Sequence, residues 1–470
     1  MSDKMNFGLI GVGVMGQNLT LNIERNGFSV AVYDRVPEKV TEFLQGKAKG
    51  KRIAGAPSVE AFLQQLDRPR RIILLVNAGK PVDDVLDHLE PWLEKGDVVI
   101  DGGNSFFMDT ERRALGLERN GIYFVGSGIS GGEEGALKGP SIMPGGAKEA
   151  YDLIAPVLTK IAAQVDGKPC CAYMGPRGAG HYVKMVHNGI EYAIMQLICE
   201  TYDIIRSGMG LSAPEISLLF KEWNRTELNS YLFEVTSKVL SKMDAGTNKP
   251  LVDFILDTAE QKGTGKWTSQ NAFDLGIPIP TINAAVESRM LSSFKDQRKS
   301  ASRTLRGPAP RSPGGESKLV TDVRDALHAS IIVSYAQGMS LLQASSAEYK
   351  YDLKLGKIAE IWRGGCIIRA KILEPIRAAF AKTPSPANMM MDEYFSSKLN
   401  ELHEQWRRAV GMAVENGIPT MAMSASLAYY DAYRRERLPA NLLQAQRDYF
   451  GAHTYRRIDK EGIFHTQWDE

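Results

Sequence analysis

The chain has 470 residues, 43% of them hydrophobic and 24% charged, as in ordinary globular proteins of two or three domains. A formal net charge of +2 argues against binding of nucleic acid or an anionic membrane through a broad basic surface. Four cysteines without a CxxC pair form no disulfide framework, and the scattered histidines predict no metal site. Without a signal peptide or an apolar run of ~18 residues, the chain is expected to be cytoplasmic.

The first predicted element is a short apolar strand over 7–10, followed by a glycine motif and a helix. Gly11, Gly13 and Gly16 form the pattern G-x-G-x-x-G. The first glycine permits a tight turn, the second permits close approach of a pyrophosphate, and the third lets the helix pack on the strand. The helix start offers free N–H groups and a positive dipole end to phosphates. Because a second strand ending at Asp34 follows, the motif predicts a dinucleotide site.

Apolar runs of strand length alternate with helical patterns through the rest of this half. The strands are expected within 70–76, 96–103 and 121–127, and the helices within 38–45, 58–65, 82–90 and 109–120. This alternation predicts a parallel, doubly wound sheet, in which ligands bind beyond the carboxyl ends of the strands. Glycines and small polar residues, which suit close approach to a ligand, follow three strands at 77–79, 101–105 and 126–132.

Two adjacent residues after the second strand make opposite predictions about the cofactor. The carboxylate of Asp34 would accept a hydrogen bond from a ribose 2′-OH and repel a 2′-phosphate, which favours NAD. The guanidinium of Arg35 would instead bind a 2′-phosphate, which favours NADP. These two residues leave both cofactors open.

Helical periodicity dominates the second half, which begins with a long helix predicted over 180–206. Lys184, His187, Asn188 and Glu191 lie at i, i+3, i+4 and i+7, so they share one face of this helix. A base, an acid and an amide on one stripe suit catalysis. A solvated stripe with i, i+4 pairs would have the same spacing.

Three further features complete the helical half. Segments that contain Trp223 and Trp362, 139 positions apart, predict an internal helical duplication. The segment 261–268 has lysines and a threonine among glycines, which is typical of a phosphate-binding loop, although it does not match the P-loop pattern. The segment 295–313 is basic and proline-containing, and is expected to be a solvated surface turn.

The C-terminal tail, 436–470, is rich in arginine and aromatic residues. Arg447 and His453 lie in its segment QRDYFGAHTYRR. Its guanidinium groups suit phosphate, so the tail is expected either to dock on a site or to be disordered.

Seven segments of the chain together resemble the decarboxylating 6-phosphogluconate dehydrogenase family over essentially the full length. They are GLIGVGVMGQNL, DGGNS, GSGISGGEEGALKGPSIMPGG, KMVHNGIEY, DTAEQKGTGKWT, AVESRMLSS and QRDYFGAHTYRR. The resemblance implies a dinucleotide-binding Rossmann domain over 1–178 and an all-helical substrate and dimerisation domain over 179–435. It also implies a homodimer, in which the tail 436–470 crosses to the partner subunit.

The resemblance implies oxidative decarboxylation of 6-phosphogluconate to ribulose 5-phosphate and CO2 with reduction of the cofactor. Lys184 matches the general base that takes the 3-hydroxyl proton as hydride leaves C3. Glu191 matches the general acid that protonates the enediol at C1. A lysine must be neutral to act as a base and a glutamate protonated to act as an acid, so we expect a lowered and a raised pKa, respectively.

The remaining site residues also follow from the resemblance. Substrate contacts are implied at Asn104, Ser130, Gly131, Gly132, His187 and Asn188, with Tyr192, Lys262, Thr264 and Arg289 at the phosphate and Arg447 and His453 supplied by the partner subunit. Cofactor contacts are implied at Gly11, Val12, Gly13, Val14, Met15, Gly16, Asp34, Arg35, Val76, Asn77, Ala78 and Asn104. The family usually carries Asn-Arg-Ser/Thr where this chain has Asp34-Arg35-Val36. NADP is therefore implied by the family, while Asp34 and Val36 favour NAD or dual use.

Two other classes fit parts of this pattern. Another β-hydroxyacid dehydrogenase would share the Rossmann half and a lysine on the following helix, but those chains are much shorter and lack a second helical unit. A non-catalytic NAD(P)-binding sensor would be expected to lose Lys184 or Glu191, and the chain has both.

Overall fold

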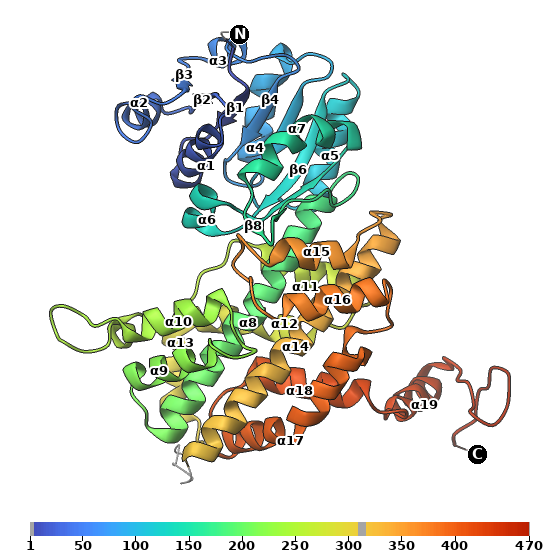
Figure 1. Cartoon of the computed structure of the whole chain (residues 1–470). Helices are drawn as coiled ribbons and strands as arrows, with labels where there is room; N and C mark the ends of the chain where they lie inside the picture. The colour runs from blue at the N-terminus through green and yellow to red at the C-terminus, as the bar shows by residue number, and fades with distance from the viewer. Residues whose placement is uncertain (1–3, 309–315, 470) are drawn as a thin grey trace.

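The computed structural model describes residues 4–308 and 316–469 as a Rossmann-type half on top of a helical body, with a C-terminal extension that projects from the body (Figure 1). The predicted fold class, a Rossmann half followed by a large all-helical half, is confirmed. None of the helices in the described ranges is both long and apolar enough to cross a bilayer.

A seven-stranded sheet forms the centre of the N-terminal half. In spatial order its strands are β3 (Ile53–Gly55), β2 (Val30–Tyr33), β1 (Phe7–Ile10), β4 (Arg71–Leu74), β5 (Val98–Asp101), β6 (Tyr123–Ile129) and β7 (Ile142–Gly145). All neighbours pair in parallel except β7, which is antiparallel to β6. The predicted parallel sheet is therefore confirmed for the first six strands, and the antiparallel edge strand β7 was not predicted. The chain returns there through one seven-residue helix, which is shorter than the usual parallel crossover.

Helices cover both faces of this sheet, as the doubly wound prediction requires. They are α1 (Val14–Arg25), α2 (Pro37–Gln45), α3 (Val59–Gln64), α4 (Lys80–Leu89), the short η1 (Glu90–Trp92), α5 (Phe107–Glu118), α6 (Gly132–Lys138) and α7 (Lys148–Ile161). Successive residues of β5 enter opposite cores: Val98 and Ile100 pack in one, and Val99 packs in the other. Their alternation shows that apolar layers lie on the two faces of the sheet.

The helical half has one continuous core. After a two-stranded ribbon, β8 (Gln164–Val165) and β9 (Lys168–Pro169), come α8 (Ala179–Met209), α9 (Ala213–Trp223), α10 (Tyr231–Ser241), η2 (Leu251–Phe254), α11 (Thr264–Asp274), α12 (Pro280–Ser292), α13 (Lys295–Thr304), α14 (Glu316–Glu348), α15 (Leu355–Trp362), α16 (Leu373–Lys382), η3 (Met389–Met391), α17 (Glu393–Glu415) and α18 (Met421–Tyr433). The long helices α8 and α14 run through its centre (Figure 1). The internal duplication stays a prediction. Its natural test is to superpose the α8–α10 unit on the α14–α16 unit.

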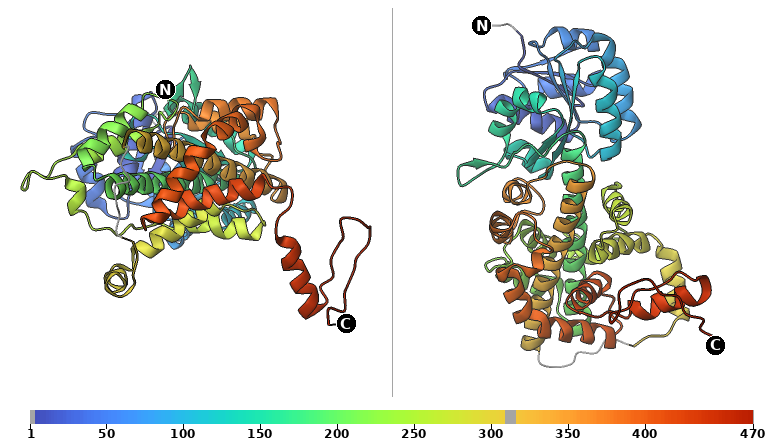
Figure 2. Two further views of the ribbon diagram at one scale, coloured as in Figure 1. Left: turned by 90° about the horizontal axis from the view of Figure 1, so that it is seen from below. Right: turned by 90° about the vertical axis from the view of Figure 1, so that its right-hand side faces the viewer.

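The structure revises the prediction for one exposed segment and bears on the two alternatives left open for another. The basic segment 295–313 begins as helix α13 instead of a turn, because four of its first ten residues are basic and none is glycine or proline. Residues 309–313 lie outside the described residues. The tail is ordered: helix α19 (Ala440–Gly451) precedes a loop closed by a bridge between Tyr455 and Phe464, and both stand away from the body (Figure 2).

Candidate active site

Helix α8 packs directly against the sheet because glycines on β6 and β7 make room for it. A Cβ atom on Gly128 would lie 2.3 Å from the Cβ of Lys184, and one on Gly145 would lie 2.2 Å from the amide nitrogen of Gly180. No side chain fits at such distances, so the helix start is locked onto the sheet. The interpretation of the 126–132 glycines as ligand-facing is therefore wrong for Gly128, which serves helix packing.

The predicted stripe on α8 lies largely in the interior, which excludes a solvated face. Lys184 and His187 are buried, while Asn188 and Glu191 are partly covered. The ammonium of Lys184 donates to Asn188 Oδ1 at 2.9 Å, and Asn188 Nδ2 donates to Thr264 Oγ1 at 3.1 Å. Burial lowers the pKa of Lys184, against the opposing effect of the Glu191 charge. The pKa shift has the direction that a neutral amine base needs.

His187 connects the stripe to the segment after β6. Its Nε2 lies 3.3 Å from Ser130 Oγ, and its Nδ1 lies 3.0 Å from Asn188 Oδ1. Burial lowers the pKa of His187 well below its usual value, with a further contribution from Lys184. The ring is therefore neutral. Because Nδ1 faces an amide oxygen, it carries the proton, and Nε2 accepts from the Ser130 hydroxyl.

Glu191 lies two turns from Lys184 on the same helix. Burial raises the pKa of its carboxyl, although the positive charges of Lys184 and Arg289 oppose this. His187 Nδ1 is 3.9 Å from Glu191 Oε2, too far for a hydrogen bond. The pKa values of Lys184 and Glu191 are thus shifted toward each other, a pattern typical of catalytic pairs.

The residues predicted to bind the substrate phosphate meet beside this stripe. The guanidinium of Arg289 lies 3.5 Å from the ring centroid of Tyr192. A Cβ on Gly265 would come within 2.5 Å of the same ring, so helix α11 is packed tightly against it. Thr264 is the first residue of α11, where backbone N–H groups lack helical partners, and Lys262 is exposed just before it.

A hollow of about 500 Å³ lies along the carboxyl ends of the first strands. It is lined by Gly11, Gly13, Arg35, Lys39, Val76 and Asn77, among others. A Cβ on Gly13 would meet nothing within 4 Å, whereas one on Gly16 would lie 1.9 Å from the carbonyl oxygen of Gly11. Gly13 thus leaves space for a ligand, and Gly16 allows close packing. The residues fit a dinucleotide, with the first amides of α1 directed at its phosphates.

Asp34 has structural partners that the sequence did not indicate. Its Oδ2 accepts from the amide of Val12 at 2.7 Å, and its Oδ1 accepts from the amide of Val36 at 2.9 Å. The Val12 amide is therefore not free for a phosphate. A carboxylate has further lone pairs for a ribose hydroxyl, but its charge is partly balanced by these two N–H groups.

Not every predicted residue lies in this cluster. Asn104 is exposed on the loop after β5, where a Cβ on the preceding Gly103 would be 3.2 Å from the carbonyl of Val76. The strand-end loops that carry Asn104 and Val76 are therefore in contact. Arg447 and His453 lie on the projecting tail, away from α8 of the same chain (Figure 2).

One neighbour of the site was not predicted. The ring of Trp362 meets His187 edge-on at 5.4 Å between centroids, and its Nε1 donates to Met143 Sδ. Nothing in the local sequence around Trp362 indicates this contact, since the residue lies 175 positions from His187. Among the described residues, no group of three or more His, Cys, Asp or Glu side chains is placed to hold a metal ion.

Comparison with known proteins covers both halves of the chain. The protein-family model for the NAD binding domain of 6-phosphogluconate dehydrogenase matches residues 6–175. The family model for the C-terminal domain of 6-phosphogluconate dehydrogenase matches residues 180–468. The chain belongs to the 6-phosphogluconate dehydrogenase family. The N-terminal half is thus the NAD-binding domain of that family, as the glycine motif predicts.

Relatives and a solved structure agree with this assignment to the 6-phosphogluconate dehydrogenases. The Bacillus subtilis (strain 168) protein named 6-phosphogluconate dehydrogenase, NADP(+)-dependent, decarboxylating, is 55% identical over 467 residues, 99% of each chain. The decarboxylating 6-phosphogluconate dehydrogenase of Escherichia coli (strain K12) is 53% identical over 466 residues, 99% of each chain. The Plasmodium falciparum 6-phosphogluconate dehydrogenase, solved in its apo form and in complexes with NADP+ and 6-phosphogluconate, has a TM-score of 0.95 at 44% identity, covering 98% of this chain and 100% of that one.

Proposed function

We propose that the chain catalyses the oxidative decarboxylation of 6-phosphogluconate to ribulose 5-phosphate and CO2, with reduction of NADP. The observation that carries the proposal is the buried stripe on α8, where burial lowers the pKa of Lys184 and raises that of Glu191. The names of the B. subtilis and E. coli relatives support the reaction, and the P. falciparum complexes support the ligands.

In the proposed mechanism, the neutral amine of Lys184 takes the 3-hydroxyl proton of the substrate. The bound nicotinamide cofactor supplies the acceptor for the hydride that leaves C3. The resulting 3-keto acid loses its carboxyl group as CO2, and the electron pair of the broken bond moves toward the ketone oxygen. Protonated Lys184 gives its proton to that oxygen, so that an enediol forms and the amine is neutral again. Glu191 then donates a proton to the carbon that becomes C1 of the product, and Lys184 takes the remaining enol proton.

The surrounding residues are proposed to bind and orient the substrate. Asn188, held by Lys184 on one side and Thr264 on the other, aligns the base. Ser130 and His187 face the sugar acid, with Gly131 and Gly132 supplying close backbone at the start of α6. Arg289, Tyr192, Thr264 and Lys262 are proposed to hold the phosphate. Arginine suits this role because its planar fork binds phosphate through paired N–H groups.

A substrate comparison tests the proposed function. Purified protein with NADP should produce reduced nicotinamide and CO2 in equal amounts from 6-phosphogluconate. Gluconate, which lacks the phosphate, should be turned over at least about a hundredfold less efficiently, because charged phosphate contacts are lost. Equal activity on 3-hydroxyisobutyrate would favour the shorter β-hydroxyacid dehydrogenases, and binding of NADP without turnover of any substrate would favour the sensor.

We infer that NADP is the preferred cofactor and that Arg35 contacts its 2′-phosphate. Arg35 and Lys39 are exposed at the hollow, and the charge of Asp34 is partly balanced by two backbone amides. These facts favour a 2′-phosphate despite the acidic residue. NAD as a slower second cofactor is consistent with Val36, which has no hydroxyl to offer the phosphate.

Replacing Arg35 by methionine is expected to lower kcat/KM with NADP by about ten- to a hundredfold, because a charged hydrogen bond to the 2′-phosphate is lost. The value with NAD should stay within about twofold, since NAD has no such phosphate. Steady-state kinetics with each cofactor measure both, with Lys49→Met, an exposed cation away from the hollow, as the control. Equal kcat/KM values of the wild type with both cofactors would contradict the inferred preference for NADP. They would support the interpretation that Asp34 opposes binding of the 2′-phosphate.

We propose that the chain acts as a homodimer in which the tail of each subunit completes the site of the other. Arg447 and His453 are exposed on a tail that carries apolar side chains in solvent, including Leu442 and Phe450. The tail has its own internal framework. The carboxylate of Asp448 accepts from the amides of Thr454 and Thr466, from the indole N–H of Trp468 and from His465. A preformed projecting unit with exposed apolar residues is expected to dock on another chain.

Hybrid dimers test whether the tail acts in trans. Lys184→Met homodimers should be inactive, and Arg447→Ala homodimers should have a substrate KM raised at least about tenfold, because a phosphate contact is lost. In a hybrid of the two chains, the subunit with intact Lys184 receives an intact tail from its partner. We therefore expect a hybrid with about half the wild-type kcat per dimer and a normal KM. A hybrid that keeps the raised KM would show that the tail acts within its own chain.

A further inference from the structure

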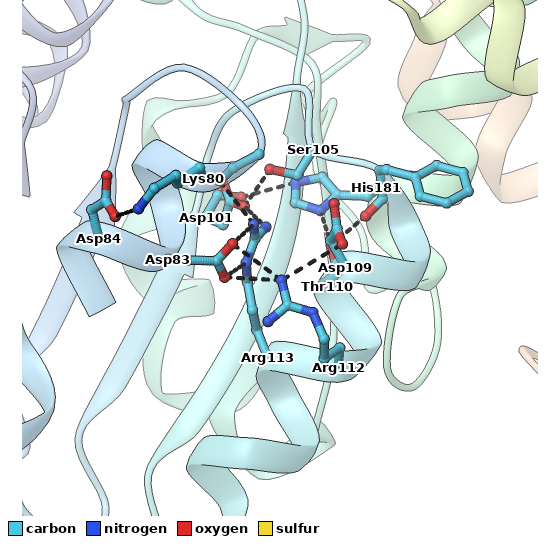
Figure 3. Close-up of polar contacts among 12 residues, drawn as sticks. Lys80, Asp83, Asp84, Asp101, Ser105, Asp109, Thr110, Arg112, Arg113 and His181 are labelled. Carbon is cyan, nitrogen blue, oxygen red and sulfur yellow. Dashed lines mark hydrogen bonds and ion pairs between the residues drawn. The ribbon is translucent and has the colours of Figure 1, made fainter. Parts of the chain in front are cut away.

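Arg113 on α5 belongs to a network of polar contacts that includes Asp83 and Asp101 (Figure 3), and it lies beside the loop 77–79, whose Asn77 lines the hollow. Its Nε donates to Asp83 Oδ1 at 2.8 Å, and one terminal nitrogen donates to the carbonyl of Gly79 at 3.0 Å and to Asp83 Oδ2 at 3.1 Å. Its other terminal nitrogen lies 3.7 Å from Asp101 Oδ2. The side chain is almost fully buried, at 1% exposure. Gly79 ends the 77–79 loop after β4, so this single guanidinium contacts the ends of two neighbouring strands.

Asp101 is the last residue of β5 and holds the second loop. Its Oδ1 accepts from the amide of Gly103 at 3.0 Å, and its Oδ2 accepts from the hydroxyl of Ser105 at 2.6 Å. Asn104 lies between these two residues. The carboxylate therefore sets the turn that presents Asn104, and Arg113 balances its charge in the interior.

The carbonyl of Asp101 also connects this loop to the helix that carries the catalytic stripe. It lies 3.1 Å from Nε2 of His181, whose Nδ1 is 2.6 Å from the hydroxyl of Thr110 on α5. Burial lowers the pKa of His181, so the ring is neutral. Nε2 then donates to the carbonyl, and Nδ1 accepts from Thr110. His181 lies one turn before Lys184 on α8.

We propose that Arg113 is a positioning residue for the cofactor: it holds the loops 77–79 and 102–105 together, and Asp101 with His181 fixes this pair to the start of α8. Strand-end loops rich in glycine have little intrinsic rigidity. Without the guanidinium, the carbonyl of Gly79 would lose its hydrogen-bond donor, and the buried carboxylate of Asp101 would lose the cation beside it. The two loops, which touch at Gly103 and Val76, would then be free to separate, and the position of a bound cofactor relative to Lys184 would no longer be set. The proposal rests on the proposed function in one respect only, namely the identity of the substrate whose KM is measured.

Arg112, the next residue on α5, provides a matched control. It donates to both oxygens of Asp83, at 2.9 and 3.1 Å, but it reaches neither Gly79 nor Asp101 and is 58% exposed. Arg112→Lys and Arg113→Lys therefore make the same chemical change beside the same carboxylate. Only Arg113→Lys removes a planar guanidinium that donates to Gly79 and at the same time lies beside the carboxylate of Asp101, because an ammonium offers no fixed fork.

The test measures the dissociation constant of NADPH from the change in NADPH fluorescence on binding. It also measures the KM values for NADP and 6-phosphogluconate. Arg113→Lys should raise the NADPH constant and the NADP KM by about tenfold, because charge-assisted contacts that order the loops are lost. The substrate KM should stay within about twofold. Arg112→Lys should change none of the three. Asp101→Asn keeps the side-chain shape and should raise the NADPH constant as Arg113→Lys does. If Arg113→Lys does not fold, Asp101→Asn serves as the test variant.

An NADPH constant in Arg113→Lys and Asp101→Asn equal to that of Arg112→Lys would overturn the proposal, whatever happens to thermal stability. A purely structural role would lower the unfolding temperature and the fraction of folded enzyme without changing the NADPH constant of the folded fraction. The binding measurement does not depend on the substrate. If the wild-type protein failed to oxidise 6-phosphogluconate, the proposed function would fail while the role of Arg113 would still be tested.

Discussion

Replacing Lys184 by methionine is expected to lower kcat by about a thousandfold or more, because positioned acid–base groups contribute up to about 10⁴ to enzymatic rates. In the proposed mechanism Lys184 acts twice, first on the 3-hydroxyl proton and then on the carbonyl oxygen that forms at C3. The methionine variant keeps the length and packing of the stem but has no amine. The KM for NADP should stay near its wild-type value, since Lys184 is not among the residues that line the hollow. Steady-state kinetics, with the NADPH dissociation constant as a check of folding, measure both effects.

The arginine variant separates a base from a simple positive charge. Arginine keeps the charge at position 184 but remains protonated at any accessible pH, so it has no lone pair to accept the substrate proton. We therefore expect Lys184→Arg to be as inactive as Lys184→Met. Substantial activity in the arginine variant would show that Lys184 acts only as a cation, and near-normal turnover in the methionine variant would remove it from the mechanism.

Replacing Glu191 by glutamine is expected to lower steady-state kcat by about a hundredfold or more, because the proton donor for the enediol is lost. Glutamine is nearly isosteric and cannot donate an acidic proton. In the proposed mechanism, hydride transfer precedes the step assigned to Glu191. Rapid mixing should therefore show a burst of reduced nicotinamide close to one per site, followed by slow turnover. A variant that is slow from the first turnover, without a burst, would place Glu191 before or at hydride transfer.

The pH dependence of kcat should follow from the same two groups. Activity is lost as pH falls through the pKa of Lys184, because the protonated amine is no longer a base. It is lost as pH rises through the pKa of Glu191, because the ionised carboxylate is no longer an acid. Burial lowers the first pKa and raises the second, so both limbs move toward neutral pH. In Glu191→Gln the residual rate should lose its alkaline limb, and an unchanged profile in that variant would contradict the assignment.

Much of the nucleotide-binding half was predictable because its signals are local. The positions of Gly11, Gly13 and Gly16 follow from a single turn and the start of one helix. In the structure Gly11 has a positive φ, Gly13 faces open space and Gly16 packs against the carbonyl of Gly11, as expected. The long helix α8 was likewise predictable from periodicity, and the stripe was found because its members are separated by one or two turns. Local spacing could not show that Lys184 is buried. That depends on Gly128 and Gly145, which approach the helix from distant strands.

The features that escaped prediction depend on contacts between distant segments. The antiparallel edge strand β7 depends on how the chain returns after α6, which alternation of strands and helices does not specify. The hydrogen bonds of Asp34 to the Val12 and Val36 amides occupy a residue that sequence reasoning assigned to the ribose. Trp362 contacts His187 and Arg113 contacts Gly79, each from a distant element, and nothing in their own sequence neighbourhoods indicates these contacts.

The most direct test of the central claim, that Lys184 and Glu191 on one buried helix face perform the decarboxylation, is the reaction of wild-type enzyme with 6-phosphogluconate and NADP in D2O. Glu191 occupies a fixed position on α8, and the proton of a carboxylic acid exchanges with solvent. It should therefore deliver one deuteron to one face of the enediol, and the ribulose 5-phosphate should carry a single deuterium at C1 in one configuration. Label in both configurations would mean that water protonates a released intermediate, and an absence of labelled product would contradict the mechanism outright.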